Sequence, residues 1–85
     1  MRVADCAAAA GIPFSSHLSP EYSAHLLAAT PTRHWLEYMD WAQDLLLDPL
    51  VPSRGIVRPS AGPGAGIAFD EHALQRRVVA AEVTC

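Results

Sequence analysis

Lysine and asparagine are both missing from this chain of 85 residues. All six basic residues are arginine and fifteen residues are alanine, a composition typical of a GC-rich genome. The absence of lysine excludes every mechanism in which this chain itself would supply a lysine. Cysteine is scarce as well: Cys6 and Cys85 lie near opposite ends, which is not a disulfide framework, so we expect both thiols to be free.

Long apolar runs and concentrated positive charge are absent too. The apolar stretch from Cys6 to Ile12 is too short to span a membrane and too rich in alanine for a good signal-peptide core. The net charge is −3 and the arginines are scattered, so no basic stripe can follow a nucleic-acid backbone. We therefore expect a cytoplasmic protein that binds neither nucleic acid nor membrane.

Apolar residues are plentiful: 51% of the chain is hydrophobic and 18% is charged, which argues against intrinsic disorder. The length allows one small domain at most, because a chain this short buries only about 60–65% of the surface that its unfolded form exposes. Small domains usually add disulfides, a metal or a partner chain to make up this shortfall.

The residue pattern over 1–40 predicts the order helix, strand, helix, strand. Gly11 is placed to end the first helix, and Ser19 followed by Pro20 is placed to cap and begin the second. A helix between two strands indicates a parallel βαβ unit, whose strands need further neighbours. The predicted elements are Arg2 to Ala10, Pro13 to His17, Pro20 to Ala29 and His34 to Tyr38.

The pattern of residues 41–85 predicts an irregular tail that packs across a surface and does not form a second hydrophobic core. The stretch from Trp41 to Leu50 is apolar with acids interspersed, and 54–63 has the composition of a loop. The glycines at 62, 64 and 66 predict a turn, since no suitable helix follows them to hold a phosphate. Asp70 is expected to cap a last helix over residues 71–79.

His17 and Glu37 each fall near the C-terminal end of a predicted strand, where α/β folds place their active sites. Neighbouring strands lie about 4.8 Å apart, so the two side chains could face one ligand. An imidazole can move a proton near neutral pH, and a buried, protonated carboxyl group can donate a hydrogen bond to developing negative charge. The alternative is that His17 caps the next helix and Glu37 is a solvated acid at the rim.

The other candidates favour structural roles. His25 is expected to pack within its helix and His34 to satisfy a loop carbonyl, and neither belongs to a zinc-like pair or a Cys-x-x-Cys motif. A hydrolase triad around Ser15 and Ser16 lacks the G-x-S-x-G turn. Acids recur at 40, 44 and 48, a spacing that predicts a solvated face, because like charges repel without a cation. We expect no metal site made by this chain alone.

Several short motifs, in order, resemble the C-terminal part of the mandelate racemase family of the enolase superfamily. They cover nearly the whole chain, and the glutamate stands twenty positions after the histidine. They are Ser15-Ser16-His17-Leu18, Pro20-Glu21, Ser23-Ala24-His25-Leu26-Leu27-Ala28-Ala29, Trp35-Leu36-Glu37, Pro63-Gly64-Ala65-Gly66-Ile67 and Phe69-Asp70-Glu71.

The resemblance implies the last part of a modified (β/α)₇β barrel of the TIM type, with strand seven, helix seven and strand eight in residues 1–40. Residues 41–85 would then pack on the barrel and its capping domain. It also implies Mg²⁺-dependent proton abstraction next to the carboxylate of a substrate such as a sugar acid, leading to racemisation or dehydration. His17 matches the family's histidine base or acid and Glu37 the acid that hydrogen-bonds the substrate, while Leu18 and Met39 are expected to line the pocket.

The family's lysine base, its three carboxylate metal ligands and the aspartate that pairs with the histidine belong to earlier strands, and none is in this chain. A barrel of this type takes about 250 residues. We therefore expect a C-terminal fragment that is inactive and poorly folded by itself, unless the missing N-terminal part or self-association covers its strand edges. A non-catalytic module that oligomerises or binds a partner, and complementation by a separately encoded N-terminal piece, remain as alternatives.

Overall fold

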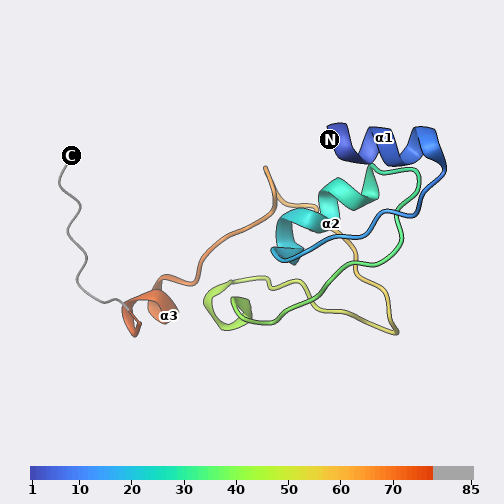
Figure 1. Cartoon of the computed structure of the whole chain (residues 1–85). Coiled ribbons are helices and arrows are strands. Elements are labelled where there is room, and N and C mark those ends of the chain that lie inside the picture. The colour runs from blue at the N-terminus through green and yellow to red at the C-terminus, as the bar shows by residue number, and fades with distance from the viewer. Residues whose placement is uncertain (78–85) are drawn as a thin grey trace.

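The computed structural model describes residues 1–77, and its first element is helix α1, Arg2–Ala10 (Figure 1). Six of the nine residues of α1 favour the helix as predicted, since five are alanine and one is arginine. Gly11 ends the helix in the left-handed region, with φ of 67°, and its N–H donates to the carbonyl of Ala8 at 3.2 Å. The predicted glycine cap of α1 is confirmed.

Helix α2, Pro20–Ala28, begins at the predicted proline and ends one residue before the predicted boundary. The expected role of the Ser19 side chain is wrong, because its hydroxyl makes no capping hydrogen bond. Ser19 adopts a left-handed backbone with φ of 46°, and its carbonyl accepts the N–H groups of Tyr22 and Ser23 at 3.1 and 2.9 Å. The proline still favours this start, since its fixed φ suits the first helical position.

The two predicted strands, 13–17 and 34–38, do not form regular strands. Within residues 1–77 they pair through one parallel bridge, between Phe14 and Arg33. The N–H of Phe14 donates to Thr32 and the N–H of His34 donates to Phe14, both at 2.8 Å. The predicted parallel direction is confirmed, but each segment has one neighbour where a buried parallel strand has two, so the ladder is short.

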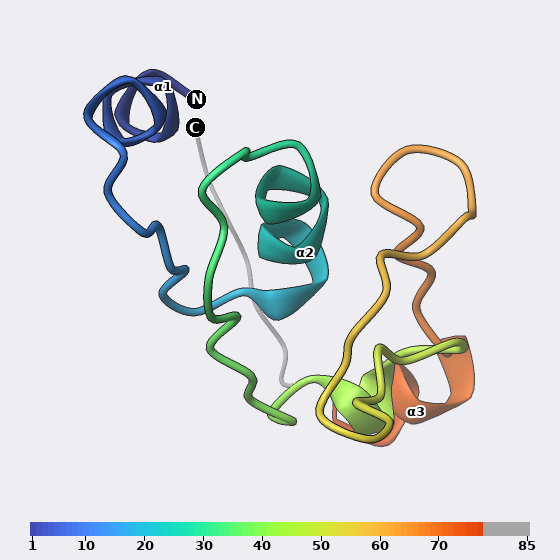
Figure 2. The ribbon, with the colours of Figure 1, turned by 90° about the vertical axis from the view of Figure 1, so that its right-hand side faces the viewer.

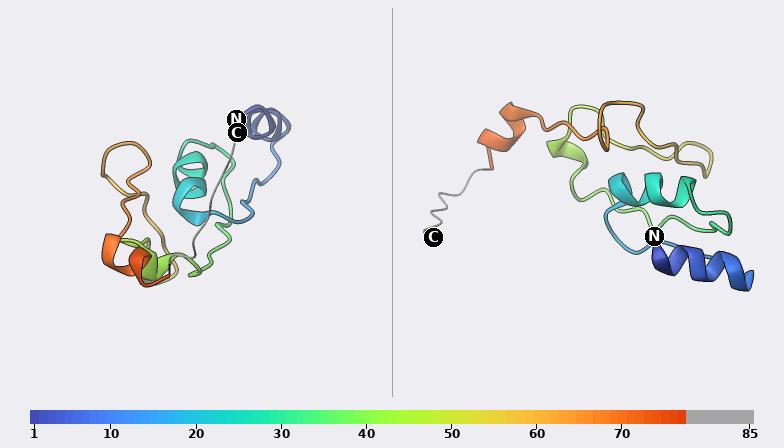
Figure 3. Two further views of the ribbon diagram at one scale, coloured as in Figure 1. Left: turned by 90° about the vertical axis from the view of Figure 1, so that its left-hand side faces the viewer. Right: turned by 90° about the horizontal axis from the view of Figure 1, so that it is seen from above.

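The paired segments lie between α1 and α2, with the later part of the chain beyond α2 (Figures 2 and 3). Little of this arrangement is buried. The buried apolar residues are Ala4, Pro20, Ala24, Leu27, Leu46 and Ala73. Three of the six are alanines, so the burial of these side chains contributes little hydrophobic free energy.

The later part of the chain folds back on itself around a 3₁₀ turn, η1 (Gln43–Leu45), and a short helix, α3 (Glu71–Gln75). Asp70 caps α3 as predicted, because its Oδ1 accepts the N–H groups of His72 and Ala73 at 3.0 and 3.3 Å. An antiparallel bridge joins Leu46 to Phe69. The last helix is shorter than predicted, and the end of its predicted range, 78–79, lies outside the described residues.

Large apolar side chains remain exposed on both parts of the chain. The exposed residues are Met1, Val3, Ile12, Tyr22, Leu26, Trp35, Trp41, Leu47, Val51, Ile56 and Phe69.

No helix within 1–77 is long and apolar enough to cross a membrane.

Candidate functional site

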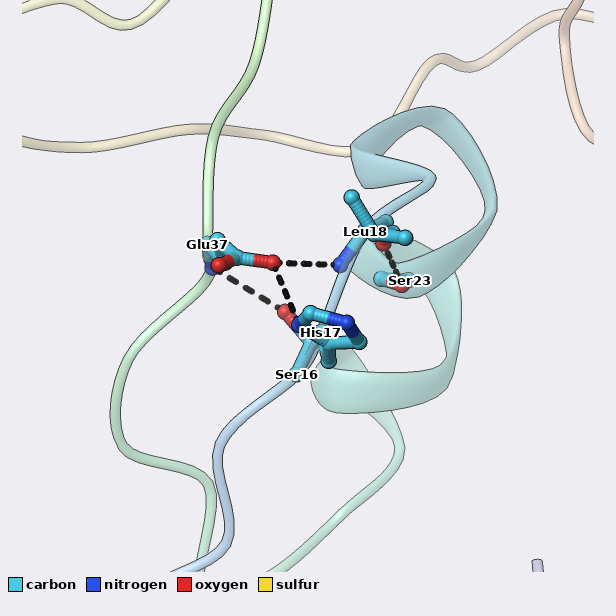
Figure 4. A network of polar contacts seen from close by, with 5 residues as sticks. All are labelled: Ser16, His17, Leu18, Ser23 and Glu37. Atoms are coloured by element: carbon cyan, nitrogen blue, oxygen red, sulfur yellow. Dashed lines mark hydrogen bonds and ion pairs between the residues drawn. The ribbon is translucent and has the colours of Figure 1, made fainter.

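His17 and Glu37, the two residues predicted to carry the chemistry, are in contact. The Nδ1 atom of His17 lies 3.0 Å from Oε2 of Glu37, and the two side chains point toward one another from the paired segments (Figure 4). The His17 side chain is 80% exposed and that of Glu37 is 37% exposed, so the pair lies at an open surface of this chain. The structure brings the two residues together, and their catalytic roles remain a prediction.

Serine hydroxyls supplement the backbone hydrogen bonds between the two segments beyond the Phe14–Arg33 bridge. The hydroxyl of Ser15 accepts the N–H of Trp35, and that of Ser16 accepts the N–H of Glu37, each at 3.1 Å. The N–H of Ser16 donates to the carbonyl of Trp35 at 3.0 Å. These contacts place Glu37 opposite the residues that follow Ser16, and so opposite His17.

The turn after His17 is strained and held from two sides. Leu18 and Ser19 have φ of 59° and 46°, in the left-handed region that costs a residue with a side chain about 1–2 kcal/mol. The N–H of Leu18 donates to Oε2 of Glu37 at 2.6 Å, and its carbonyl accepts the hydroxyl of Ser23 at 2.9 Å (Figure 4). Strained turns held in this way are common at functional sites.

Leu18 and Met39, predicted to line the pocket, border one open hollow of about 210 Å³. His17 and Glu37 do not line this hollow, although Leu18 joins it to them through its hydrogen bond to Glu37. The remaining lining residues are Ser19, Pro20, Glu21, Trp41 and Ala42. The four predicted site residues therefore lie along one edge of the chain, without a closed cavity between them.

The other histidines lie away from this pair. The Nε2–H of His25 donates to the carbonyl of Ala65 at 2.9 Å, so this side chain ties α2 to the glycine-rich turn instead of packing within its own helix. The ring of His34 lies against Trp35 with the ring centres 4.7 Å apart.

Magnesium does not fit the described residues. Residues 1–77 contain no group of three His, Cys, Asp or Glu side chains that could hold a metal ion. Asp40, Asp44 and Asp48 are all exposed, as the prediction of a solvated face requires, and Asp44 forms an ion pair with Arg77.

Sequence reasoning missed the roles of Ser16 and Ser23. Ser16 stands directly before the site histidine and Ser23 lies one turn into α2. The signal that points to Ser16 is a hydroxyl at the end of a predicted strand, where a side chain can replace a ladder carbonyl.

Comparison with known proteins assigns this arrangement to a family. The family described as "Enolase C-terminal domain-like" matches residues 1–73. An enolase from Bradyrhizobium, solved with magnesium and mandelic acid, is 47% identical over 87% of this chain and 20% of its own, with a TM-score of 0.77. An enolase from an alpha proteobacterium with bound magnesium is 42% identical over 89% of this chain and 21% of its own, with a TM-score of 0.82.

A third solved structure has a more specific activity. The L-talarate/galactarate dehydratase from Salmonella typhimurium LT2, solved with magnesium and L-lyxarohydroxamate, is 31% identical over 87% of this chain and 19% of its own, with a TM-score of 0.75. The chain thus spans about a fifth of the length of the solved structures that it matches.

The matches define part of a TIM-barrel-type α/β fold of the enolase superfamily. Within that superfamily the chain belongs to the mandelate racemase family, as the resemblance of its motifs implied.

Proposed function

We propose that this chain provides the proton-handling end of a mandelate-racemase-like enzyme that removes the proton next to a substrate carboxylate. In this proposal residues 1–40 are strand seven, helix seven and strand eight of a modified (β/α)₇β barrel. Residues 41–85 are the tail that packs on the barrel and the capping domain. The product would be a racemised acid or a dehydrated acid sugar, made in the cytoplasm.

The observation that carries the proposal is the 3.0 Å contact between Nδ1 of His17 and Oε2 of Glu37 within a segment that matches the family. Because Nδ1 faces the carboxylate, Nε2 is the atom through which His17 would take or return a substrate proton. Oε2 of Glu37 already accepts the N–H of Leu18, so Oε1 is the oxygen that would hydrogen-bond the substrate carboxylate. Leu18 and Met39 would contact the rest of the substrate.

Mg²⁺ enters the proposal only as a group bound elsewhere in the enzyme. The matched relatives were solved with magnesium, whereas residues 1–77 of this chain offer no set of ligands for it. The chain also contains no lysine to act as a second base. We therefore expect the chain alone to be inactive and to depend on further barrel strands, or on self-association, to cover its paired segments.

Replacement of the matching fifth of the Bradyrhizobium enolase by this chain tests the proposal. With Mg²⁺ in D₂O, proton NMR should show exchange of the α-proton of mandelate, galactarate or talarate. His17→Asn should slow that exchange by about 10²–10⁴-fold, the usual contribution of a general acid or base, and Glu37→Gln should also reduce it. His34→Gln, a change of an exposed histidine outside the pair, is the control and should leave the rate unchanged. Undiminished exchange of both enantiomers of mandelate in the His17→Asn chimera would overturn the proposed role, because a lysine base in the rest of the chimera can serve only one of them.

A non-catalytic assembly module is the second candidate, and exposed apolar side chains favour it. Tyr22, Leu26 and Trp35 are 58%, 54% and 68% exposed, although they belong to α2 or to the segment beside it. Association of copies would remove this surface from water. Analytical ultracentrifugation of the chain alone should show a stable oligomer that Mg²⁺ does not alter, and a monomer would exclude this candidate.

A further inference from the structure

We propose that Ser16 and Ser23 are positioning residues that hold Glu37 and the turn after His17 in register. The hydroxyl of Ser16 fixes the backbone of Glu37, and the hydroxyl of Ser23 fixes the carbonyl of Leu18. The catalytic meaning of this inference rests on the proposed function, and its geometry rests on these two hydrogen bonds. Neither serine touches the reacting atoms in this proposal, so both act through Glu37 and Leu18.

Ser16 holds the second segment at two adjacent points. Its N–H donates to the carbonyl of Trp35 at 3.0 Å, and its hydroxyl accepts the N–H of Glu37 at 3.1 Å. In a regular parallel ladder a backbone carbonyl would accept that N–H, and a side chain takes its place here. Because both bonds come from one residue, Ser16 fixes where the Glu37 side chain leaves the backbone. That side chain then reaches His17 and the N–H of Leu18.

Ser23 holds the strained turn from the side of α2. The left-handed conformation of Leu18 is unfavourable for a residue with a side chain, so the contacts on both of its peptide groups help to hold it. Glu37 accepts the N–H at 2.6 Å, and Ser23 donates its hydroxyl to the carbonyl at 2.9 Å. The bond from Ser23 therefore keeps the N–H of Leu18 directed at the carboxylate that also contacts His17. Hydrogen bonds and one ion pair connect these residues into one network (Figure 4). Its members are Ser16, His17, Leu18, Ser23 and Glu37.

Ser15 is a natural control for Ser16. Its hydroxyl also accepts an N–H of the second segment at 3.1 Å, but that N–H belongs to Trp35 and makes no contact with the carboxylate network. Removal of the Ser15 hydroxyl therefore tests general pairing of the segments, whereas removal of the Ser16 hydroxyl tests the position of Glu37.

NMR of the chimera with the Bradyrhizobium enolase, isotope-labelled in the segment that this chain supplies, tests the proposal where further barrel strands cover the paired segments. The readouts are the hydrogen-exchange protection of the Leu18 amide and the ¹⁵N shift of His17 Nδ1. Ser16→Ala should lower the protection roughly two- to tenfold, as expected for the loss of one hydrogen bond, and should move the Nδ1 signal. Ser16→Thr, which keeps the hydroxyl, should restore both readouts, and Ser15→Ala should change neither.

Other outcomes would overturn the proposal. Equal changes in Ser15→Ala and Ser16→Ala would assign the serines to general pairing. An unprotected Leu18 amide in the unaltered chimera would show that the network does not form. Loss of helical circular dichroism in Ser16→Ala would mean that this variant does not fold. In that case Ser23→Ala provides the test, and it should lower the protection of the Leu18 amide without lowering that of other amides. These readouts need no turnover, so they can fail or succeed independently of α-proton exchange in the chimera.

Discussion

Residues 1–40 and residues 41–77 are organised differently. The first part has two helices of nine residues each, a parallel bridge and the buried residues Ala4, Ala24 and Leu27. The second part has a 3₁₀ turn, a helix of five residues and antiparallel bridges, with Leu46 and Ala73 buried. Each part therefore has its own few buried residues, and the hydrogen bonds of the candidate site lie within the first.

The two parts are linked by side-chain hydrogen bonds. The hydroxyl of Tyr38 donates to the carbonyl of Leu50 at 2.8 Å, and Nε2–H of His25 donates to the carbonyl of Ala65 at 2.9 Å. No atom of the His17–Glu37 network takes part in these links. The geometry of the site should therefore survive changes that loosen the second part, and the following predictions test this separation.

The largest effect is expected from Leu27→Ala, compared with Leu46→Ala. Both leucines are at most 9% exposed and each is the largest buried apolar side chain of its part, so each substitution should cost about 2–5 kcal/mol. Urea titrations in sucrose, followed by residue-specific NMR, should show loss of the Leu18 amide signal only for Leu27→Ala and of the Ala73 signal only for Leu46→Ala. Loss of both signals in either variant would show that the chain is one cooperative unit.

The second-largest effect is expected from Gly11→Ala, compared with Gly64→Ala. The two glycines have φ of 67° and 62°, and an added Cβ would meet no other heavy atom within 4 Å at either position. Each change therefore adds backbone strain alone, about 1–2 kcal/mol. Far-UV circular dichroism should weaken for Gly11→Ala, because α1 loses its end, and stay constant for Gly64→Ala, which lies in a turn. Equal losses would contradict a purely local effect.

The helices could be predicted from the sequence because their signals are local. The alanine run, Gly11 and Pro20 set most of the boundaries of α1 and α2 without help from distant residues. The strands could not be predicted as they are, because strand length depends on neighbours and each segment has only one here. Their parallel direction followed from the helix between them.

The candidate site shows the same division. The nearness of His17 and Glu37 follows from their places at the ends of two adjacent parallel segments, which sequence spacing reveals. The roles of Ser16 and Ser23 depend on which way a hydroxyl turns and on a left-handed backbone at Leu18, and no spacing rule specifies either. The sequence predicts that the side chain of Ser19 caps α2, whereas in the folded turn the backbone carbonyl of Ser19 accepts the hydrogen bonds.

Tyr38→Phe should loosen the link between the parts while it preserves the site. It removes the hydrogen bond to Leu50, worth about 1 kcal/mol. Burial, and then the charges of Asp40 and Glu21, raise the pKa of Tyr38 above its ordinary value. The folded chain thus holds this proton more tightly than the unfolded chain. The resulting stability is complete below the pKa of the unfolded tyrosine and is lost as the pH rises through the folded pKa, above about pH 10.

Urea titrations of the unaltered chain and of Tyr38→Phe at several alkaline pH values would measure this effect. The unaltered chain should lose stability across that range more steeply than the variant. The Leu18 amide should keep its protection in Tyr38→Phe at neutral pH. If the free energy of unfolding changed with pH identically in both proteins, ionisation of Tyr38 would not be the cause of the loss. Loss of Leu18 protection in the variant would show that the site depends on the second part.

The smallest effect concerns the ion pair between Asp44 and Arg77, which spans η1 and the residue after the C-cap of α3. Both side chains are more than half exposed, at 54% and 60%, so water and salt screen their attraction. A double-mutant cycle with Asp44→Asn and Arg77→Gln should give a coupling of about 0.2–0.5 kcal/mol that disappears at high salt. Asp48→Asn, at an acid that forms no ion pair within residues 1–77, serves as the control and should not couple with Arg77→Gln. A coupling above about 1 kcal/mol would mean that charge, and not the burial of Leu46 and Ala73, holds the second part together.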